Sequence, residues 1–131
     1  MNNRRNDYRH PFAVDDRLRV ELTAAGGRRL AAGQIVDLSV GGLAYLGDAP
    51  IRLDPAHPVV VHFAIPHGLR RLAIPAAVVY TGAEEEGSPF GLRFLPLDDA
   101  DAQEERDKAL WVFLLDEQRR ERRRRRGEAP G

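Results

Sequence analysis

The chain of 131 residues contains no cysteine. Disulfide bonds, zinc sites built from thiolates and cysteine nucleophiles are therefore excluded. Serine occurs only at Ser39 and Ser88, and Ser39 lacks the leading glycine of the G-x-S-x-G turn that serine hydrolases use. The histidines are His10, His57, His62 and His67. Their spacing matches neither H-E-x-x-H nor another metal-ligand pattern. These absences predict a protein that is not an enzyme and has no metal site.

Long apolar runs are also missing. No stretch approaches the roughly 20 consecutive apolar residues that a membrane helix needs. The first ten residues, MNNRRNDYRH, are polar and lack the apolar region of a secretory signal. P-loop and dinucleotide-binding fingerprints are absent as well. The sequence therefore predicts a cytoplasmic protein without a membrane span, of a length that suits one domain with its own core.

The net charge of zero hides an uneven distribution. The last 13 residues hold seven arginines against Glu121 and Glu128, a local charge of +5, so the remaining 118 residues carry −5. Arg4, Arg5 and Arg9 make the N-terminus basic too. Such asymmetry is typical of proteins that bind an anion or an acidic partner.

From Asp16 onward, apolar and polar residues alternate as they do in strands with one buried face. The first predicted strand buries Leu18, Val20 and Leu22, and a turn follows at 25–27. Further strands are predicted at about 30–38, 43–46, 59–65, 72–80 and 90–94. Six short antiparallel strands in about 80 residues predict an all-β fold, a small barrel that closes to hide its strand edges.

After Leu97 the apolar residues recur at helical spacing. Asp98, Asp99 and Asp101 offer N-cap oxygens to a helix predicted at 98–120. Its apolar stripe consists of Ala109, Leu110, Trp111, Phe113 and Leu114. This stripe should pack on the barrel or on a partner. The arginines that follow repel one another, so we expect them to fray into a disordered tail.

The domain plan that follows has four parts. Residues 1–12 carry almost no apolar periodicity and form a flexible arm without a helix or strand of its own. The barrel occupies 13–97, the amphipathic helix 98–120 and the arginine-rich disordered tail 121–131. No internal repeat is present.

The first candidate binding feature is the sequence RNDYR at 5–9. Two arginines four apart, in a segment with no helical pattern, can turn their guanidinium groups toward one concave ligand. A guanidinium binds phosphate bidentately and can stack on a purine, so Arg5 and Arg9 suit a nucleotide. Taken alone, R-x-x-x-R is common and more often marks an exposed basic arm without a ligand.

The second candidate feature is the sequence DLSVGG at 37–42, at the end of a predicted strand. The Asp37 carboxylate can accept two N–H donors, and the Watson–Crick edge of guanine offers two that are adjacent. The Ser39 hydroxyl can donate or accept. Gly41 and Gly42 permit close backbone approach and positive φ, so main-chain N–H groups could face an anion. The alternative is a turn in which Asp37 and Ser39 only satisfy local backbone groups.

In this order and at this separation, the two features together resemble the PilZ family. Its signature is R-x-x-x-R in a flexible N-terminal segment, followed by D/N-x-S-x-x-G on a barrel. The matching positions are Arg5, Arg9, Asp37, Ser39 and Gly42. The resemblance extends to Leu43 after the paired glycines, to a short last strand at 91–94 and to a helix after the barrel, and so covers roughly residues 4–115.

This resemblance implies a six-stranded antiparallel PilZ-type β-barrel with a C-terminal α-helix, in a bacterial receptor of the second messenger cyclic di-GMP. In the family the arm folds over the ligand and the D-x-S-x-x-G segment holds a guanine. The ligand-binding residues so implied are Arg4, Arg5, Arg9, Asp37, Ser39, Gly41 and Gly42. Arg4 makes the motif R-R-x-x-x-R, a variant that in the family tends to accompany capture of a ligand dimer. No cofactor is implied.

The implied function is a receptor whose arm changes conformation on binding and signals to an unidentified protein partner. One alternative is a PilZ-like adaptor that binds no ligand and contacts proteins through the helix face that carries Leu110, Trp111, Phe113 and Leu114. Another is a binder of nucleic acid or acidic surfaces through the arginines between Arg119 and Arg126. The partner, its pathway (motility, polysaccharide synthesis or transcription), the ligand stoichiometry and the oligomeric state all stay open.

Overall fold

The computed structural model describes residues 9–49, 53–65, 70–80 and 89–128. The elements follow the chain in the order β1 (His10–Pro11), the short 3-10 helix η1 (Val14–Asp16), β2 (Leu18–Ala24), β3 (Arg29–Leu38), β4 (Gly42–Gly47), β5 (Val59–Ile65), β6 (Arg70–Tyr80), β7 (Phe90–Phe94) and α2 (Ala100–Glu128). The six strands predicted from the alternating pattern are therefore present as β2 to β7.

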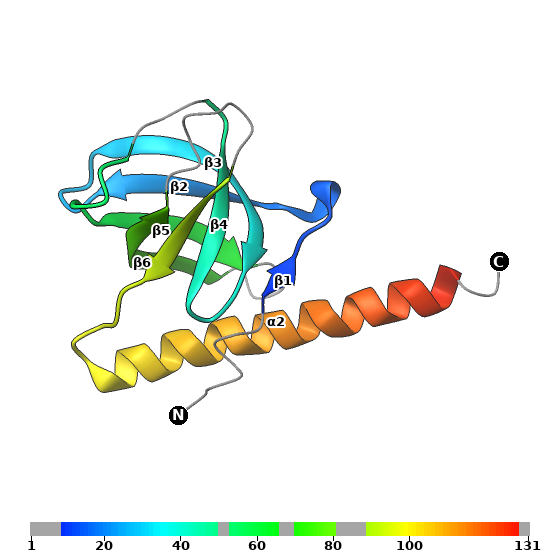
Figure 1. Ribbon diagram of the computed structural model, residues 1–131. Coiled ribbons are helices and arrows are strands. Elements are labelled where there is room, and N and C mark those ends of the chain that lie inside the picture. The colour runs from blue at the N-terminus through cyan, green and yellow to red at the C-terminus, as the bar shows by residue number, and fades with distance from the viewer. Residues whose placement is uncertain (1–8, 50–52, 66–69, 81–88, 129–131) are drawn as a thin grey trace.

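These six strands form a closed antiparallel barrel (Figure 1). The strand order is β1-β3-β2-β5-β6-β7-β4, and an additional pairing of β3 with β4 closes the ring. The predicted all-β barrel is thus confirmed, with β1 added outside the ring along β3. Closure leaves no free edge among β2 to β7, which explains how such short strands make a stable sheet.

The barrel interior is filled by the residues that alternate inward along each strand. On β2, Val20 and Leu22 are buried as their spacing predicts. Tyr45 on β4 is also fully buried, and its hydroxyl donates a hydrogen bond of 2.8 Å to the carbonyl oxygen of Ala32 on β3. A buried tyrosine needs such a partner, because an unpaired hydroxyl in the core costs free energy.

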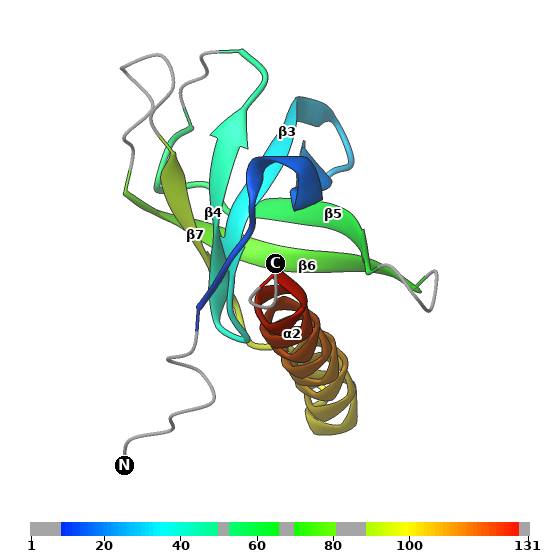
Figure 2. The ribbon, with the colours of Figure 1, turned by 90° about the vertical axis from the view of Figure 1, so that its right-hand side faces the viewer.

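Helix α2 lies along one side of the barrel, as Figure 2 shows in a view nearly along its axis. Leu110, Phe113 and Leu114 are buried in the same core cluster as the strand residues. At the start of the helix, the Asp99 carboxylate accepts hydrogen bonds from the amides of Asp101 (2.9 Å) and Ala102 (3.4 Å). It thereby satisfies N–H groups that the first turn leaves without partners.

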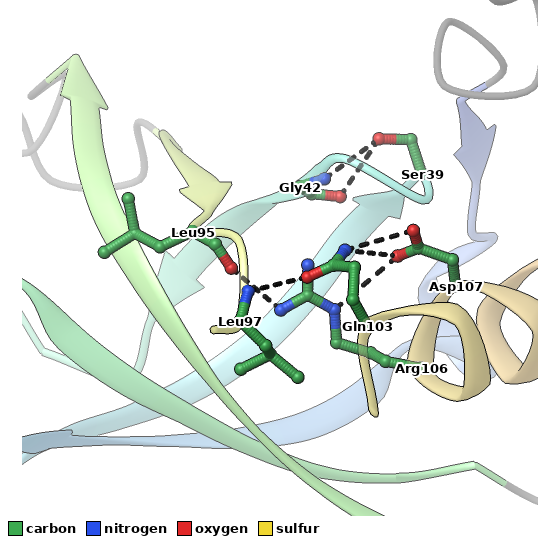
Figure 3. A network of polar contacts seen from close by, with 7 residues as sticks. All are labelled: Ser39, Gly42, Leu95, Leu97, Gln103, Arg106 and Asp107. Carbon is green, nitrogen blue, oxygen red and sulfur yellow. Dashed lines mark hydrogen bonds and ion pairs between the residues drawn. The ribbon is translucent and has the colours of Figure 1, made fainter. Parts of the chain in front are cut away.

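The connection from β7 to α2 is fixed by a buried arginine (Figure 3). Arg106 is only 7% exposed, and its Nη1 donates a hydrogen bond of 2.9 Å to the carbonyl oxygen of Leu95. Gln103, one turn earlier, accepts a hydrogen bond of 2.7 Å from the amide of Leu97. These two contacts hold the first turns of α2 against the end of the barrel.

The predicted extent of the helix is wrong at its C-terminal end. We expected the helix to end near residue 120 and the arginines at 122–126 to fray, but α2 continues to Glu128. Arginine is a good helix former, and several of these side chains find acidic partners. Arg120 pairs with Glu117 at 3.1 Å and Arg125 with Glu121 at 2.9 Å, which offsets part of the repulsion along the segment.

Two further expectations need correction. The arm was predicted to have no strand of its own, yet His10–Pro11 forms β1 because it pairs with Asp37 and Leu38 of β3. The apolar helix face proposed for contact with another protein is instead occupied within the chain. Leu110, Phe113 and Leu114 are buried, and Trp111 packs partly buried against the same core.

Candidate functional site

The D-x-S-x-x-G segment forms the tight turn that joins β3 to β4. The Ser39 amide donates to the carbonyl oxygen of Gly42 at 2.8 Å. The Ser39 hydroxyl accepts from the Gly42 amide at 3.1 Å and lies 3.2 Å from the Gly42 carbonyl oxygen, to which it donates. Figure 3 shows both contacts of the Ser39 hydroxyl with Gly42. Ser39 is only 2% exposed. Its side chain therefore fixes the shape of the turn, as the alternative interpretation of the sequence supposed.

Close packing against β7 requires glycine at position 42. A Cβ atom added to Gly42 would lie 2.3 Å from the carbonyl oxygen of Leu92, so no larger residue fits there. The carbonyl oxygen of Gly41 accepts a hydrogen bond of 2.8 Å from the amide of Phe94. Among the described residues only Gly27 has a positive φ, so the positive φ considered for Gly41 and Gly42 is not adopted.

The described part of the arm is held beside this turn by backbone and apolar contacts. His10 and Pro11 pair with Leu38 and Asp37 in β1, and the Phe12 amide donates to the carbonyl oxygen of Val36 at 3.0 Å. Phe12 is 6% exposed and its ring stacks on that of Phe113, with centroids 6.3 Å apart. These contacts fix the backbone that follows Arg9 and so hold Arg9 next to Asp37.

Arg9 makes a direct contact with the turn. Its Nη1 donates a hydrogen bond of 2.9 Å to Oδ1 of Asp37, across 28 positions of sequence. The side chain of Arg9 is 60% exposed and that of Asp37 is 28% exposed. We call this ion pair the arm pair. It joins the second arginine of R-x-x-x-R to the first residue of D-x-S-x-x-G.

The sequence-predicted site residues divide into three groups. Arg9 and Asp37 lie together at the surface, in contact with each other. Ser39, Gly41 and Gly42 lie beside them but serve the turn and its packing on β7. Arg4 and Arg5 lie outside the described residues.

Sequence reasoning missed the residues that anchor the arm. Phe12 was placed at the end of a flexible segment, whereas its side chain is part of the core cluster. A hollow between the arm and the far half of α2 is lined by His10, Pro11, Phe12, Ala13, Asp16, Glu117, Glu121 and Arg124. Arg124 bridges it with an ion pair of 3.0 Å to Asp16. A phenylalanine directly after Pro11 was the signal that the arm ends in the core.

A second arginine–aspartate pair lies elsewhere on the barrel. Arg19 on β2 donates to both carboxylate oxygens of Asp48, which follows β4, at 2.8 Å and 2.5 Å. We call it the barrel pair. The hydrogen bond from Arg19 lowers the pKa of Asp48, and the same bond raises the pKa of Arg19. No sequence motif points to this pair, and it provides a matched reference for the arm pair.

Neither a metal site nor a spanning helix is found in the part of the chain that the structure describes. No group of three or more histidine, aspartate or glutamate side chains there could hold a metal ion. None of its helices is long and apolar enough to cross a membrane.

The sequence matches the family model of the PilZ domain over residues 3–110. The chain belongs to the PilZ domain family. This confirms the resemblance inferred from the two motifs, and the matched range includes both of them. Members of this family are receptor or adaptor domains. No curated protein matches the sequence.

Solved structures of PilZ domains share the fold. The PilZ domain of CeSA from a cellulose-synthesizing bacterium has 21% identity and a TM-score of 0.60, with 80% of this chain and 96% of that chain covered. The PilZ domain with c-di-GMP of YcgR from Escherichia coli has 14% identity and a TM-score of 0.62, covering 87% of this chain and 93% of that one. The Bacillus subtilis inhibitor of motility MotI/DgrA has 18% identity and a TM-score of 0.61, covering 87% and 51%.

Proposed function

We propose that this PilZ domain is a cytoplasmic receptor for cyclic di-GMP. The observation that supports it most is the arm pair, in which Arg9 contacts Asp37 at 2.9 Å. Two motifs 28 residues apart in the chain thereby meet at one exposed place on the barrel.

The residues fit the chemistry of the ligand. Asp37 presents a carboxylate that is 28% exposed, and among the described residues only its Oδ1 is bonded. Once Arg9 moves aside, the two carboxylate oxygens can accept the adjacent N1–H and N2–H donors of a guanine. Arg9 is 60% exposed and offers further N–H donors to a phosphate, with Arg5 as the other arginine of the motif.

The arm pair suggests how binding changes the shape of the protein. While Asp37 holds Arg9, the arm stays near the turn with its arginine neutralised. A guanine that takes the Asp37 carboxylate displaces the Arg9 guanidinium, which then binds a ligand phosphate. One internal ion pair is exchanged for two contacts to the ligand, and the arm shifts. The changed surface then carries the signal to a partner protein.

Calorimetric titration with cyclic di-GMP tests this proposal. Hydrogen bonds to charged groups contribute roughly 1.5–3 kcal/mol each, and about 1.4 kcal/mol corresponds to a tenfold change in affinity. We therefore expect Arg9→Ala and Asp37→Ala each to weaken binding at least tenfold. Arg4→Ala should reduce the number of ligands per chain if two are captured.

The matched control is Arg19→Ala, which removes an equally exposed arginine from the barrel pair. Its affinity for cyclic di-GMP should equal that of the wild type. Absence of binding by the wild-type protein would refute the receptor function. Binding that survives both Arg9→Ala and Asp37→Ala would leave the receptor function standing and refute the assignment of the site.

A further inference from the structure

Helix α2 has a second face that the barrel does not use. The core residues Leu110 and Leu114 point to one side, and Figure 2 shows that the strands lie on that side of the helix only. An α-helix has 3.6 residues per turn, so each residue is rotated by 100° from the one before it. This rotation identifies which residues lie on the opposite side. Between Asp101 and Arg123 they recur at spacings of three or four residues, as residues along a helix–helix seam do.

We call this face the outer stripe. It consists of Asp101, Glu105, Lys108, Val112, Asp116, Arg119 and Arg123. The spacings along it are 4, 3, 4, 4, 3 and 4, so the stripe is symmetric in position about Val112. At 100° per residue, all seven positions fall within a band about 80° wide. The stripe is thus one continuous line along the helix, about 33 Å long at 1.5 Å per residue.

The side chains of the outer stripe are accessible. All are exposed except Asp116, which is half-buried, and Val112 is 56% exposed. None of the six charged side chains forms a hydrogen bond or ion pair with another residue in the described part of the chain. The neighbouring Arg124 and Arg125, which lie off the stripe, are by contrast paired with Asp16 and Glu121. The stripe therefore presents six charges that no contact among the described residues uses.

The charges are antisymmetric about Val112. Asp101 and Glu105 are acidic where the symmetry-related Arg123 and Arg119 are basic, and Lys108 is basic where Asp116 is acidic. An antiparallel copy of the same stripe, related by a two-fold axis through Val112, opposes each charge with one of the other sign. We propose that the outer stripe is the interface of a homodimer, in which two α2 helices pack antiparallel about Val112.

A second copy fits this stripe better than another acidic molecule does. A nucleic acid or an acidic protein would be attracted to Arg119 and Arg123 but repelled by Asp101, Glu105 and Asp116. Only a partner with the reverse order of charges complements both ends, and the antiparallel copy has that order. Such two-fold pairing is the commonest form of self-association, because each contact occurs twice. Charged pairs along a helix seam also set its orientation.

The apolar content of the stripe indicates how strong the dimer is. Val112 meets its own copy on the axis and is the only apolar residue of the outer stripe. Such a small apolar centre is far below that of obligate dimers, and exposed ion pairs are weak and screened by salt. We therefore expect a reversible dimer that forms at high protein concentration and low ionic strength and dissociates as salt is added.

Sedimentation equilibrium on the full chain tests the proposal. The average mass should rise from 14.6 kDa toward twice that value as concentration increases at low salt, and fall again in physiological or higher salt. A chain that stays at 14.6 kDa up to millimolar concentration at low salt would overturn the proposal. A dimer insensitive to salt would also overturn it, because it would have to use another surface.

Charge reversal then locates the interface. We expect Arg119→Glu/Arg123→Glu, and separately Asp101→Arg/Glu105→Arg, each to weaken self-association at least tenfold. A mixture of the two variants should recover it, since each reversed end then opposes a complementary one. Recovery in the mixture also excludes misfolding as the cause of the loss. Failure to recover would refute the antiparallel register.

The control is Arg70→Glu/Arg71→Glu on β6, which changes the net charge as much as Arg119→Glu/Arg123→Glu does. It should leave the dimer intact. If it dissociates the dimer to the same extent, net charge and not the outer stripe governs association, and the proposal is wrong.

Discussion

The arm pair and the barrel pair use the same two residue types on the same barrel, with different bonding. In the barrel pair Arg19 contacts both oxygens of Asp48, whereas in the arm pair Arg9 contacts only one oxygen of Asp37. The two arginine side chains are equally exposed, at 60%. The difference therefore lies in how fully each aspartate is used and not in how much solvent reaches the arginine.

The electrostatics of the barrel pair agree with its bonding. The hydrogen bond from Arg19 lowers the pKa of Asp48, although partial burial of the carboxylate acts against it. Tyr45 lies close by, and its burial raises the pKa of its hydroxyl to about 12, so it stays neutral and bonded to Ala32. The barrel pair is complete within the protein. Among the described residues, the arm pair leaves Oδ2 of Asp37 without a partner, and an incomplete pair is one that a ligand can enter.

The largest change we expect comes from removing the anchor beneath the arm pair. Phe12→Ala should lower the free energy of unfolding by about 3–5 kcal/mol, the range for truncating a buried phenylalanine, because Phe12 is 6% exposed and stacks on Phe113. Chemical denaturation measures this loss. Binding of cyclic di-GMP by the folded fraction should weaken too, since Arg9 then loses its fixed starting point. The barrel pair should not change in Phe12→Ala, because neither Arg19 nor Asp48 belongs to the arm.

Val14→Ala serves as the control for that substitution. Val14 follows closely in the chain and is 68% exposed, so its truncation should change stability by less than about 0.5 kcal/mol. A loss for Phe12→Ala no greater than for Val14→Ala would mean that the arm is not anchored in solution, and that the arm pair forms by chance contact.

The strands were predictable from the sequence because their inward residues alternate. The period-2 pattern located β2 to β7 nearly to the residue, since a closed barrel buries one face of every strand. The two-residue strand β1 was not predictable. It exists only because Phe12 enters the core and the adjacent backbone then pairs with β3, a tertiary effect with no local pattern.

The sequence predicted which residues gather at the site but not what each of them does there. Arg9 and Asp37 meet as their motifs indicate, yet Ser39 and Gly42 have structural tasks that spacing alone cannot distinguish from ligand contacts. The predicted helix was too short, because a row of like charges indicated fraying. In the structure, Glu117, Glu121 and Asp16 form ion pairs with the arginines. One of these partners, Asp16, is distant in sequence and becomes a neighbour only through the fold.

A smaller effect is expected from the turn that supports Asp37. Ser39→Ala removes the hydroxyl bonded to the amide and carbonyl of Gly42, and so should cost about 1–3 kcal/mol of stability. Because Ser39 is buried, its loss should weaken cyclic di-GMP binding less than Asp37→Ala does. Calorimetry on both variants measures this order. If Ser39→Ala weakened binding more, the hydroxyl would have to reach the ligand, and the turn would have to open on binding.

The smallest effect is expected at the barrel pair, and it depends on pH. Arg19→Ala should lower stability at neutral pH by less than about 1 kcal/mol, because the pair is exposed. The folded-state pKa of Asp48 lies below its ordinary value of 3.8, so the contribution of the pair is fully present above that value. It is lost as pH falls through the lower folded-state pKa, where the carboxylate becomes protonated. Thermal unfolding of wild type and Arg19→Ala should therefore differ slightly at neutral pH and converge in strong acid. A difference that persists in strong acid would show that Arg19 stabilises the barrel through packing of its aliphatic chain, and the barrel pair would then no longer serve as an electrostatic reference for the arm pair.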